Sequence, residues 1–345
     1  MRFALDESGS FPTKANTPIP PVSVAVTLVV PDDEWGGLLS SYRAFRSTLA
    51  PEELKNGEPK GGRLKPASKL RYCDMLVLHP RVLVCPCIVD LGHFPHQGAA
   101  SLRDGLSQDL AVLARAVPDQ EEQAKLAAVS AKIADLSPPQ AVRLYTWARS
   151  FFHGLHYAIR LEDVGDTLTE WDQREFLIDP VQSTHGSDEE VVLGEMLPSW
   201  MASWSSLSDG QRSWAFEVPD QKECPHHSFR DRFLEGDRID LEALLSGRVR
   251  FDRASKDEEL LQVSDIAASI TYHAARRPEA GSNAVAVYES LMRSCPYEPD
   301  FGIGLITPHP ELAGGRLSNR FSALVDALRR SFLAYRAVSG APFPG

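Results

Sequence analysis

The sequence begins with an acidic segment whose residue types could bind a metal ion. A short apolar stretch leads into Asp6-Glu7-Ser8-Gly9. A carboxylate at the end of a strand can face a crevice above a sheet and hold a hard cation through its oxygen atoms, and Gly9 would let the chain turn sharply after it. Asp and Ser are also common turn residues. The segment therefore indicates either a simple turn or a metal ligand at Asp6.

A second acidic residue, Asp265, stands inside the apolar segment 260–268, LLQVSDIAA. An aspartate in the middle of a helix is unfavourable for helix formation, and if it is buried it needs a cation, a basic side chain or hydrogen-bond donors. The small side chains of Ala267 and Ala268 would let this helix pack closely on a sheet. The alternative is a surface-facing aspartate on an amphipathic helix. His273 follows Asp265 by two turns, and its position suits a proton shuttle.

The elements that would position these residues alternate between strands and helices. Alternating or continuous apolar runs predict strands, because a strand buries one or both of its faces. The predicted strands are residues 1–6, 22–30, 81–90, 175–179, 214–218, 247–251 and 301–306. Residues 7–10 are predicted to form a turn. Pro86 predicts an edge position or a bulge for its strand.

Apolar residues at helical spacing predict helices between the strands. The predicted helical regions are residues 35–49, most of 100–163, 192–206, 255–276 and 316–337. Capping boxes that start at Ser137 and Ser255 mark the beginnings of two of these helices. Residues 50–68 are rich in Gly, Pro and Lys, and we expect a loop with a short helical piece there.

Length and composition fit this arrangement. The chain has 345 residues, which suits two domains or one large elaborated domain, and 43% hydrophobic residues exclude a disordered or fibrous chain. We expect a first part of the core at 1–99, a helical insertion at 100–163, and a second part of the core with C-terminal helices at 164–345. No apolar run reaches the about 18 residues of a membrane helix, and because acidic residues occur early we expect no secretory signal. Five irregularly spaced cysteines suit a reducing, cytoplasmic compartment.

The net charge of −11 limits the kinds of partner that we expect. A protein that covers nucleic acid without sequence preference is normally basic, so a broad positive footprint is excluded. An enzyme that meets phosphates through metal ions remains compatible with this charge. The local basic stretch at 55–69 is either a solvated loop or a phosphate contact. The sequence has no phosphate-binding P-loop and no G-x-G-x-x-G fingerprint after a strand, so we expect no nucleotide cofactor.

Together, the two acidic segments resemble the family catalogued as domain of unknown function 3800. The opening strand and D-E-S-G of that family are similar to residues 3–9. Its closing Ser-Lys step and its L-Q-x-A-D helix are similar to Ser255-Lys256 and to residues 261–265, where Ser264 replaces the usual Ala. Its E-x-K element is similar to Glu53-Leu54-Lys55, and its interior-strand Asp is similar to Asp179 in EFLIDP.

The resemblance implies an α/β fold with a ribonuclease H-like mixed sheet flanked by helices and a large helical insertion. It implies a nuclease that hydrolyses phosphodiester bonds of DNA or RNA with two Mg²⁺ or Mn²⁺ ions, held about 3.5–4 Å apart by clustered carboxylates. One ion would activate water and the other would stabilise the leaving oxygen. The implied metal ligands are Asp6, Glu53, Asp179 and Asp265, and the implied phosphate contacts are Lys55 and Lys256.

Two of these assignments have alternatives in the sequence. Glu52 or Glu58 could take the place of Glu53, because the surrounding segment is rich in Gly and Pro. Asp90 also ends a predicted strand and competes with Asp179. The sequence therefore leaves the third and fourth ligands open.

A function of a different class is a catalytically silent ribonuclease H-like module that binds proteins in a bacterial multi-protein system. The acidic charge and the long helical insertion favour protein contacts, including a homodimer through the insertion. An ion pair that locks Asp265 to Lys55 or Lys256 would favour the module. Open carboxylates within reach of one metal ion would favour the enzyme.

Overall fold

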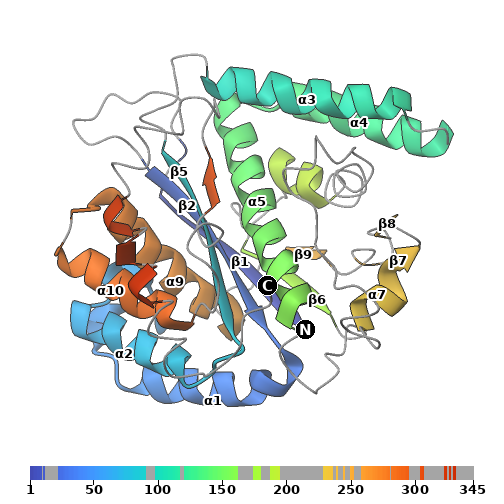
Figure 1. Ribbon diagram of the computed structural model, residues 1–345. Coiled ribbons are helices and arrows are strands. Elements are labelled where there is room, and N and C mark those ends of the chain that lie inside the picture. The colour runs from blue at the N-terminus through green and yellow to red at the C-terminus, as the bar shows by residue number, and fades with distance from the viewer. Residues whose placement is uncertain are drawn as a thin grey trace.

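The protein is described by a computed structural model, and its central element is a mixed β-sheet with helices on both faces (Figure 1). The described residues are 1–9, 11, 22–90, 98–116, 120–161, 174–179, 187–194, 228–235, 238–239, 244, 249–251, 258–279, 281–294, 304–306, 322–324, 326–327 and 329–331. Residues 162–173, 195–227 and 252–257 are among those outside this set. The predicted strand at 214–218 lies there, as does most of the predicted helix at 192–206.

Six strands form the sheet in the order β10-β5-β2-β1-β6-β9. Their bounds are β1 Arg2–Gly9, β2 Val22–Val30, β5 Leu83–Asp90, β6 Glu175–Ile178, β9 Val249–Phe251 and β10 Gly304–Ile306. Strand β2 pairs antiparallel with β1 and with β5, whereas the β1–β6, β6–β9 and β5–β10 pairs are parallel. All nine residues of β2 are buried, which explains why its sequence is an unbroken apolar run instead of an alternating one.

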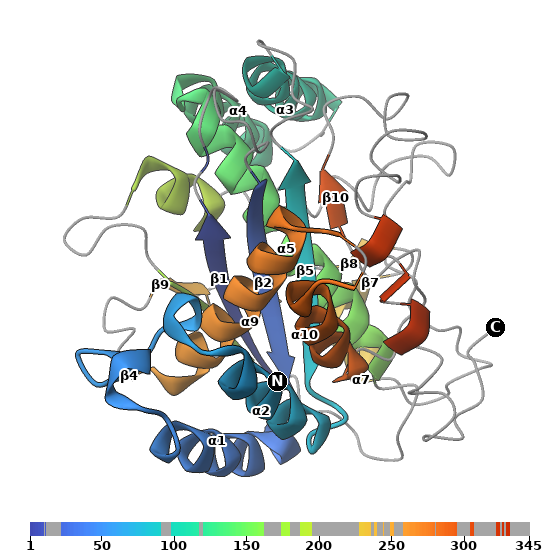
Figure 2. The same cartoon turned by 90° about the vertical axis from the view of Figure 1, so that its left-hand side faces the viewer.

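One face of the sheet is covered by α9 (Glu259–Arg276), which lies across β1 and β2 (Figure 2). Outside α9 lie α1 (Asp32–Ser47), α2 (Pro66–Val77) and α10 (Asn283–Leu291). The hydroxyl of Tyr42 donates to the side chain of Gln262 at 2.8 Å, and that of Tyr72 donates to the Val263 carbonyl at 2.7 Å. These buried hydrogen bonds attach α1 and α2 to the N-terminal part of α9.

The other face is covered by α5 (Pro138–Leu161), which packs on β2, β5 and β1. A hairpin of α3 (Gly98–Ala116) and α4 (Gln120–Asp135) packs against α5 and projects from the body of the molecule (Figure 1). The helical content predicted for 100–163 is therefore present. Of the described residues of this segment, the α3–α4 hairpin stands apart from the sheet, whereas α5 is a layer of the core.

Several expectations from the sequence need correction. The predicted turn at 7–10 is wrong for residues 7–9, because β1 continues to Gly9 and pairs with β2 throughout. Gly9 adopts a φ of 106°, and a side chain there would meet the Val22 carbonyl oxygen at 2.8 Å. No bulge occurs at Pro86, because the register between β5 and β2 is unbroken. The strand is also not at the sheet edge, although the β10 ladder begins only at Cys87, directly after Pro86.

The segment after α1 contains more regular structure than the sequence predicted. Residues 50–68 hold short 3₁₀ helices at Pro51–Glu53 and Gly61–Arg63, and a small hairpin of β3 (Leu54–Lys55) and β4 (Glu58–Pro59). Helix α2 was not predicted. Within the described residues, no helix is long and apolar enough to cross a membrane.

Two helical glycines give a matched test of the packing between α5 and the sheet. A Cβ atom at Gly154 would lie 2.7 Å from Cγ2 of Thr27, whereas a Cβ at Gly105 would meet nothing within 4 Å. We expect Gly154→Ala to destabilise the protein by about 1–3 kcal/mol through overpacking. Gly105→Ala should stabilise it by about 0.5–1 kcal/mol, because Ala favours the helix. Urea unfolding followed by circular dichroism measures both changes, and equal effects would contradict the close packing of α5.

Candidate acidic site between the sheet and α9

Asp6 lies on the face of the sheet that α9 covers. Ala4 belongs to the apolar core on that face, and Leu5 belongs to the core on the α5 face. Because side chains alternate along a strand, the Asp6 side chain lies on the same face as Ala4, and the Glu7 side chain lies on the same face as Leu5. Asp6 is 5% exposed, and its Oδ1 accepts a hydrogen bond from the Glu7 N–H at 2.6 Å.

Asp179 lies beside Asp6 at the end of the neighbouring parallel strand. The register pairs Ala4 with Leu177 and Leu5 with Ile178, and the Asp179 N–H donates to the Leu5 carbonyl at 3.1 Å. Asp6 lies two residues after Ala4, and Asp179 lies two residues after Leu177. The two aspartates therefore stand side by side on the same face of the sheet.

Asp265 is presented by α9, which approaches the sheet closely at this point. The hydroxyl of its neighbour Ser264 is 3.2 Å from the Ala4 carbonyl and 3.1 Å from the Val26 carbonyl. On the other side of α9, the Gly61 N–H donates to Oδ2 of Asp265 at 3.1 Å. A Cβ at Gly61 would lie 2.5 Å from Cβ of Ser269, so only glycine fits between this loop and the helix.

The negative charges of Asp179 and Asp265 both act on Asp6. Burial raises the pKa of Asp6 well above its ordinary value, and the negative charges of Asp265 and Asp179 raise it further. Burial also raises the pKa of Asp265, which the Gly61 hydrogen bond and the positive charge of Lys60 oppose. Asp179 at the end of β6 and Asp265 on α9 therefore lie near enough to Asp6 on β1 for their charges to act on it.

The loop after α1 contributes a glutamate and a lysine that differ from those first assigned. The sequence contains two E-x-K triplets, Glu53-Leu54-Lys55 and Glu58-Pro59-Lys60. The second lies at the site, because Glu58 raises and Lys60 lowers the pKa of Asp265. The ammonium of Lys60 is 2.6 Å from Oε1 of Glu58. Glu58 was an alternative in the sequence, whereas Lys60 was noted only as part of a basic stretch.

Glu53 has a structural role in this loop. Its Oε2 accepts from the Ala50 N–H at 3.1 Å, and its Oε1 accepts from the Lys65 N–H at 2.9 Å. Hydrogen bonds from the Lys65 and Ala50 N–H groups and from Ser68 hold the pKa of Glu53 below its ordinary value, although burial opposes them. The glutamate thus links the chain before Pro51–Glu53 to the start of α2.

The remaining residues assigned from the sequence lie apart from the cluster or outside the described chain. Lys55 is exposed on β3, and Lys256 lies outside the described residues. Among the described residues, Asp265 forms no ion pair with a lysine or an arginine. Asp90 is buried at the end of β5, where it pairs with Val22, while Asp6 pairs with Val26. The four-residue offset places Asp90 about 13 Å further along the sheet, so Asp179 is the better neighbour of Asp6.

The donors of the cluster are all carboxylate oxygens, which suit a hard divalent cation such as Mg²⁺ or Mn²⁺. The repulsion of Asp6 by Asp179 and Asp265 is the kind of interaction that a bound cation would relieve. Across the described part of the chain, no three His, Cys, Asp or Glu side chains are close enough together to hold one metal ion. The chemistry of the donors fits a metal, and their present spacing is wider than a loaded site requires.

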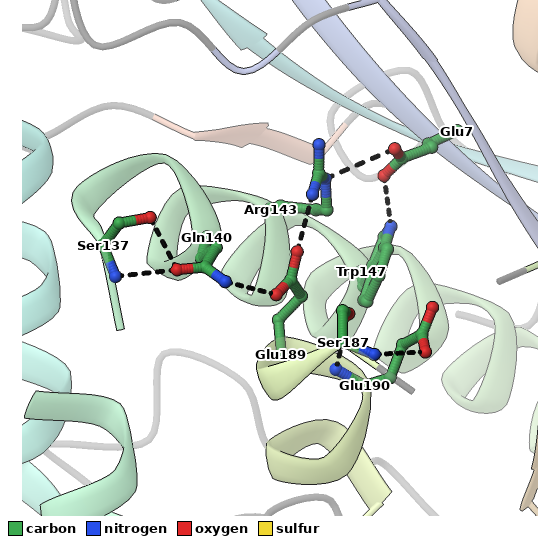
Figure 3. A network of polar contacts seen from close by, with 8 residues as sticks. All are labelled: Glu7, Ser137, Gln140, Arg143, Trp147, Ser187, Glu189 and Glu190. Carbon is green, nitrogen blue, oxygen red and sulfur yellow. Dashed lines mark hydrogen bonds and ion pairs between the residues drawn. The ribbon is translucent and has the colours of Figure 1, made fainter. Parts of the chain in front are cut away.

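Glu7, the neighbour of Asp6, points to the opposite face of the sheet and binds α5 (Figure 3). The Trp147 indole donates to Oε2 of Glu7 at 2.7 Å, and Nε of Arg143 lies 3.3 Å from Oε1. Arg143 also pairs with Glu189 in the helical segment 188–194 at 2.6 Å, and Gln140 donates to the same carboxylate at 2.8 Å. Burial raises the pKa of Glu7 to about 7, although Arg143 and Trp147 oppose that shift. The network fixes the strand that carries Asp6.

Comparisons with known proteins add no relative. No family model matches the chain, no curated protein matches it, and no solved structure matches it. The resemblance to the domain of unknown function 3800 family therefore stays a prediction that depends on the residues quoted above.

The electrostatics of the cluster predict a stability change that depends on pH. Because folding raises the pKa of Asp6 above its ordinary value of 3.8, ionised Asp6 destabilises the folded protein. The loss begins above the unfolded-state pKa, grows with pH, and becomes constant above the folded-state pKa. Each pKa unit corresponds to about 1.4 kcal/mol.

We therefore expect Asp6→Asn to stabilise the metal-free protein at about pH 8 and to match the parent as the pH falls towards about 4. The amide oxygen can still accept from the Glu7 N–H. Urea unfolding in EDTA across this range measures the difference, and Asp74→Asn, at an exposed position on α2, is the control. A destabilisation of Asp6→Asn that is the same at every pH would contradict the proposed repulsion.

Proposed function

We propose that this protein is a divalent-metal-dependent nuclease that hydrolyses phosphodiester bonds of DNA or RNA. The observation that carries the proposal is the convergence of Asp6, Asp179 and Asp265 from two adjacent parallel strands and one helix. Buried carboxylates that repel one another reduce stability, and such groups concentrate at functional sites. Their oxygen chemistry suits a site for Mg²⁺ or Mn²⁺.

The sheet topology supports a ribonuclease H-like fold for this activity. Five strands taken in chain order, β1, β2, β5, β6 and β9, occupy the sheet positions 3-2-1-4-5, and only β2 runs antiparallel to its neighbours. A ribonuclease H-like sheet has this order, with β10 as an addition beside β5. The central strand of the five is β1, and it carries Asp6. Since fold alone does not define activity, the argument depends on the acidic residues.

Each residue of the acidic site has a separate role in the proposed reaction. Asp6, Asp179 and Asp265 would hold the metal ions, with Glu58 as the fourth carboxylate in place of Glu53. Bound Mg²⁺ or Mn²⁺ supplies an activated water and stabilises charge on the leaving oxygen in sites of this kind. The Gly61 N–H orients Asp265 through its hydrogen bond. Lys60 offsets part of the negative charge of Asp265 and Asp6, and it would offset charge on a bound phosphate.

Substitution of the two central aspartates tests the activity directly. Asp6→Asn and Asp265→Asn should each lower Mn²⁺-dependent cleavage at least about a hundredfold, because each removes charge that binds the metal. Labelled single- and double-stranded DNA and RNA, with Mn²⁺ or with EDTA, are the substrates. In parallel, Mn²⁺ should raise the unfolding temperature of the parent and not of the variants. A parent protein that neither cleaves any substrate nor responds to Mn²⁺ would remove the proposal.

A second pair of variants decides which E-x-K triplet belongs to the site. Glu58→Gln should reduce Mn²⁺-dependent cleavage and leave stability nearly unchanged. Glu53→Gln should instead destabilise the protein by about 1–3 kcal/mol, because buried hydrogen bonds to two backbone N–H groups are weakened. Cleavage rates and urea unfolding, measured on both variants, separate the two roles. The opposite pattern would restore Glu53 as the ligand.

The protein-interaction module remains the alternative. Two results together would favour it. The purified protein would show no metal-dependent cleavage, and deletion of the α3–α4 hairpin would abolish binding to a protein partner. The absence of an ion pair between Asp265 and any lysine or arginine of the described residues does not favour it.

A further inference from the structure

A pocket of about 350 Å³ opens between α2, α9 and α10, on the outer side of the same helix that carries Asp265. Its lining residues are Pro66, Lys69, Ile270, His273, Arg276, Arg277, Asn283, Ala284 and Val287. None of the described residues that line it is acidic. In a chain with a net charge of −11, a pocket bordered by a lysine, two arginines and a histidine is a local reversal of charge.

The cationic side chains of the pocket are not neutralised by acidic side chains among the described residues. Among the described residues, the side chains of Lys69, Arg276 and Arg277 form no ion pair. Other surface arginines do have such partners, for example Arg43 with Glu259 at 2.7 Å. Lys69 is half-buried, and burial lowers its pKa. The pKa of His273 is lowered to about 4 by burial and by the charges of Lys69, Arg276 and Arg277. These groups repel one another, and a bound anion would relieve that repulsion.

The first turn of α10 adds a further attraction for anions. Asn283 and Ala284 are its first residues and border the pocket. The side chain of the preceding Ser282 accepts from the Val285 N–H at 3.2 Å, which leaves the N–H groups of the first two residues directed out of the helix. A helix N-terminus next to unpaired basic side chains is a favourable place for a phosphate group.

The pocket has a fixed relation to the acidic site, because both lie along α9. His273 follows Asp265 by eight residues, which is about 12 Å along a helix. Arg276 follows Asp265 by eleven residues, or about three whole turns, which is about 16 Å along the helix axis. A nucleic-acid strand advances about 3.4 Å per nucleotide along its axis, so these distances span about three to five nucleotides.

We propose that this pocket binds a backbone phosphate of a nucleic-acid strand whose scissile phosphate lies at the acidic site. The assignment of the strand as a substrate rests on the proposed function, and the binding itself does not. Lys69, Arg276 and Arg277 contact the phosphate oxygens, while Asn283 and Ala284 offer N–H groups from α10. The same phosphate chemistry could come from free inorganic phosphate, which the experiment separates from a strand.

Binding is measured in EDTA, where no metal-dependent cleavage occurs. The probe is a fluorescein-labelled single-stranded oligonucleotide of about twelve nucleotides, followed by fluorescence anisotropy at several salt concentrations. Arg277→Glu is the principal variant, because Arg277 is exposed and its replacement need not disturb the core. Lys69→Gln is the second, milder variant. Arg115→Glu on α3, an exposed arginine away from the pocket, is the control with the same charge change.

We expect Arg277→Glu to weaken oligonucleotide binding about tenfold or more, as loss of one charged phosphate contact requires. The slope of log affinity against log salt should fall by about one unit. Arg115→Glu should retain nearly the parent affinity. With Mn²⁺ present, Arg277→Glu should raise KM for the oligonucleotide and leave turnover of a small phosphodiester, bis(p-nitrophenyl) phosphate, unchanged.

Equal oligonucleotide affinities for the parent, Arg277→Glu and Arg115→Glu would overturn the proposal, as would a parent that does not bind the oligonucleotide. An unfolding temperature that rises with inorganic phosphate in the parent only, without any difference in oligonucleotide binding, would also overturn it, because the pocket would then be a small-anion site. Loss of binding in the pocket variants with no metal-dependent cleavage by the parent would uphold the pocket and refute the nuclease function.

Discussion

The close contact between α9 and the central strands is the constraint on which the site depends. Ser264 makes hydrogen bonds to carbonyls of two strands, and Gly61 packs against the outer side of the helix with no room for a side chain. This packing keeps Asp265 near Asp6 although their negative charges repel. The apolar contacts of α9 with the sheet, α1, α2 and α10 must outweigh that repulsion.

Asp6 and Glu7 are neighbours on β1 and serve different functions on the two faces of the sheet. Asp6 faces α9, where acidic groups gather, and Glu7 faces α5, where Trp147 and Arg143 bind it. A strand makes this division automatically, because neighbouring side chains point in opposite directions. The polar network on the α5 face therefore holds the strand in place, while the α9 face keeps carboxylates that repel one another.

Local patterns in the sequence were sufficient to predict β1, β2, β5 and most helices, because apolar spacing directly reflects burial. They also suggested Asp6, Asp179 and Asp265 as candidate ligands, since each stands at a strand end or inside an apolar helix, and that assignment stays a prediction. The E-x-K triplet could not be chosen this way, because Glu53 and Glu58 differ only in which tertiary neighbours they meet. The turn predicted at 7–10 failed for a related reason: pairing with β2 extends the strand beyond what turn-forming residues indicate.

The single continuous helix α9 also restricts how related chains could vary. One extra residue between Asp265 and His273 would rotate everything after it by about 100° and shift it by about 1.5 Å, so the basic side chains would leave the side that faces α2 and α10. Insertions are far easier to accommodate in the α3–α4 hairpin, which touches the rest of the molecule mainly through α5. Length differences among homologues should therefore occur in that hairpin. The length of α9 should stay constant, because it sets the distance between the acidic site and the basic pocket.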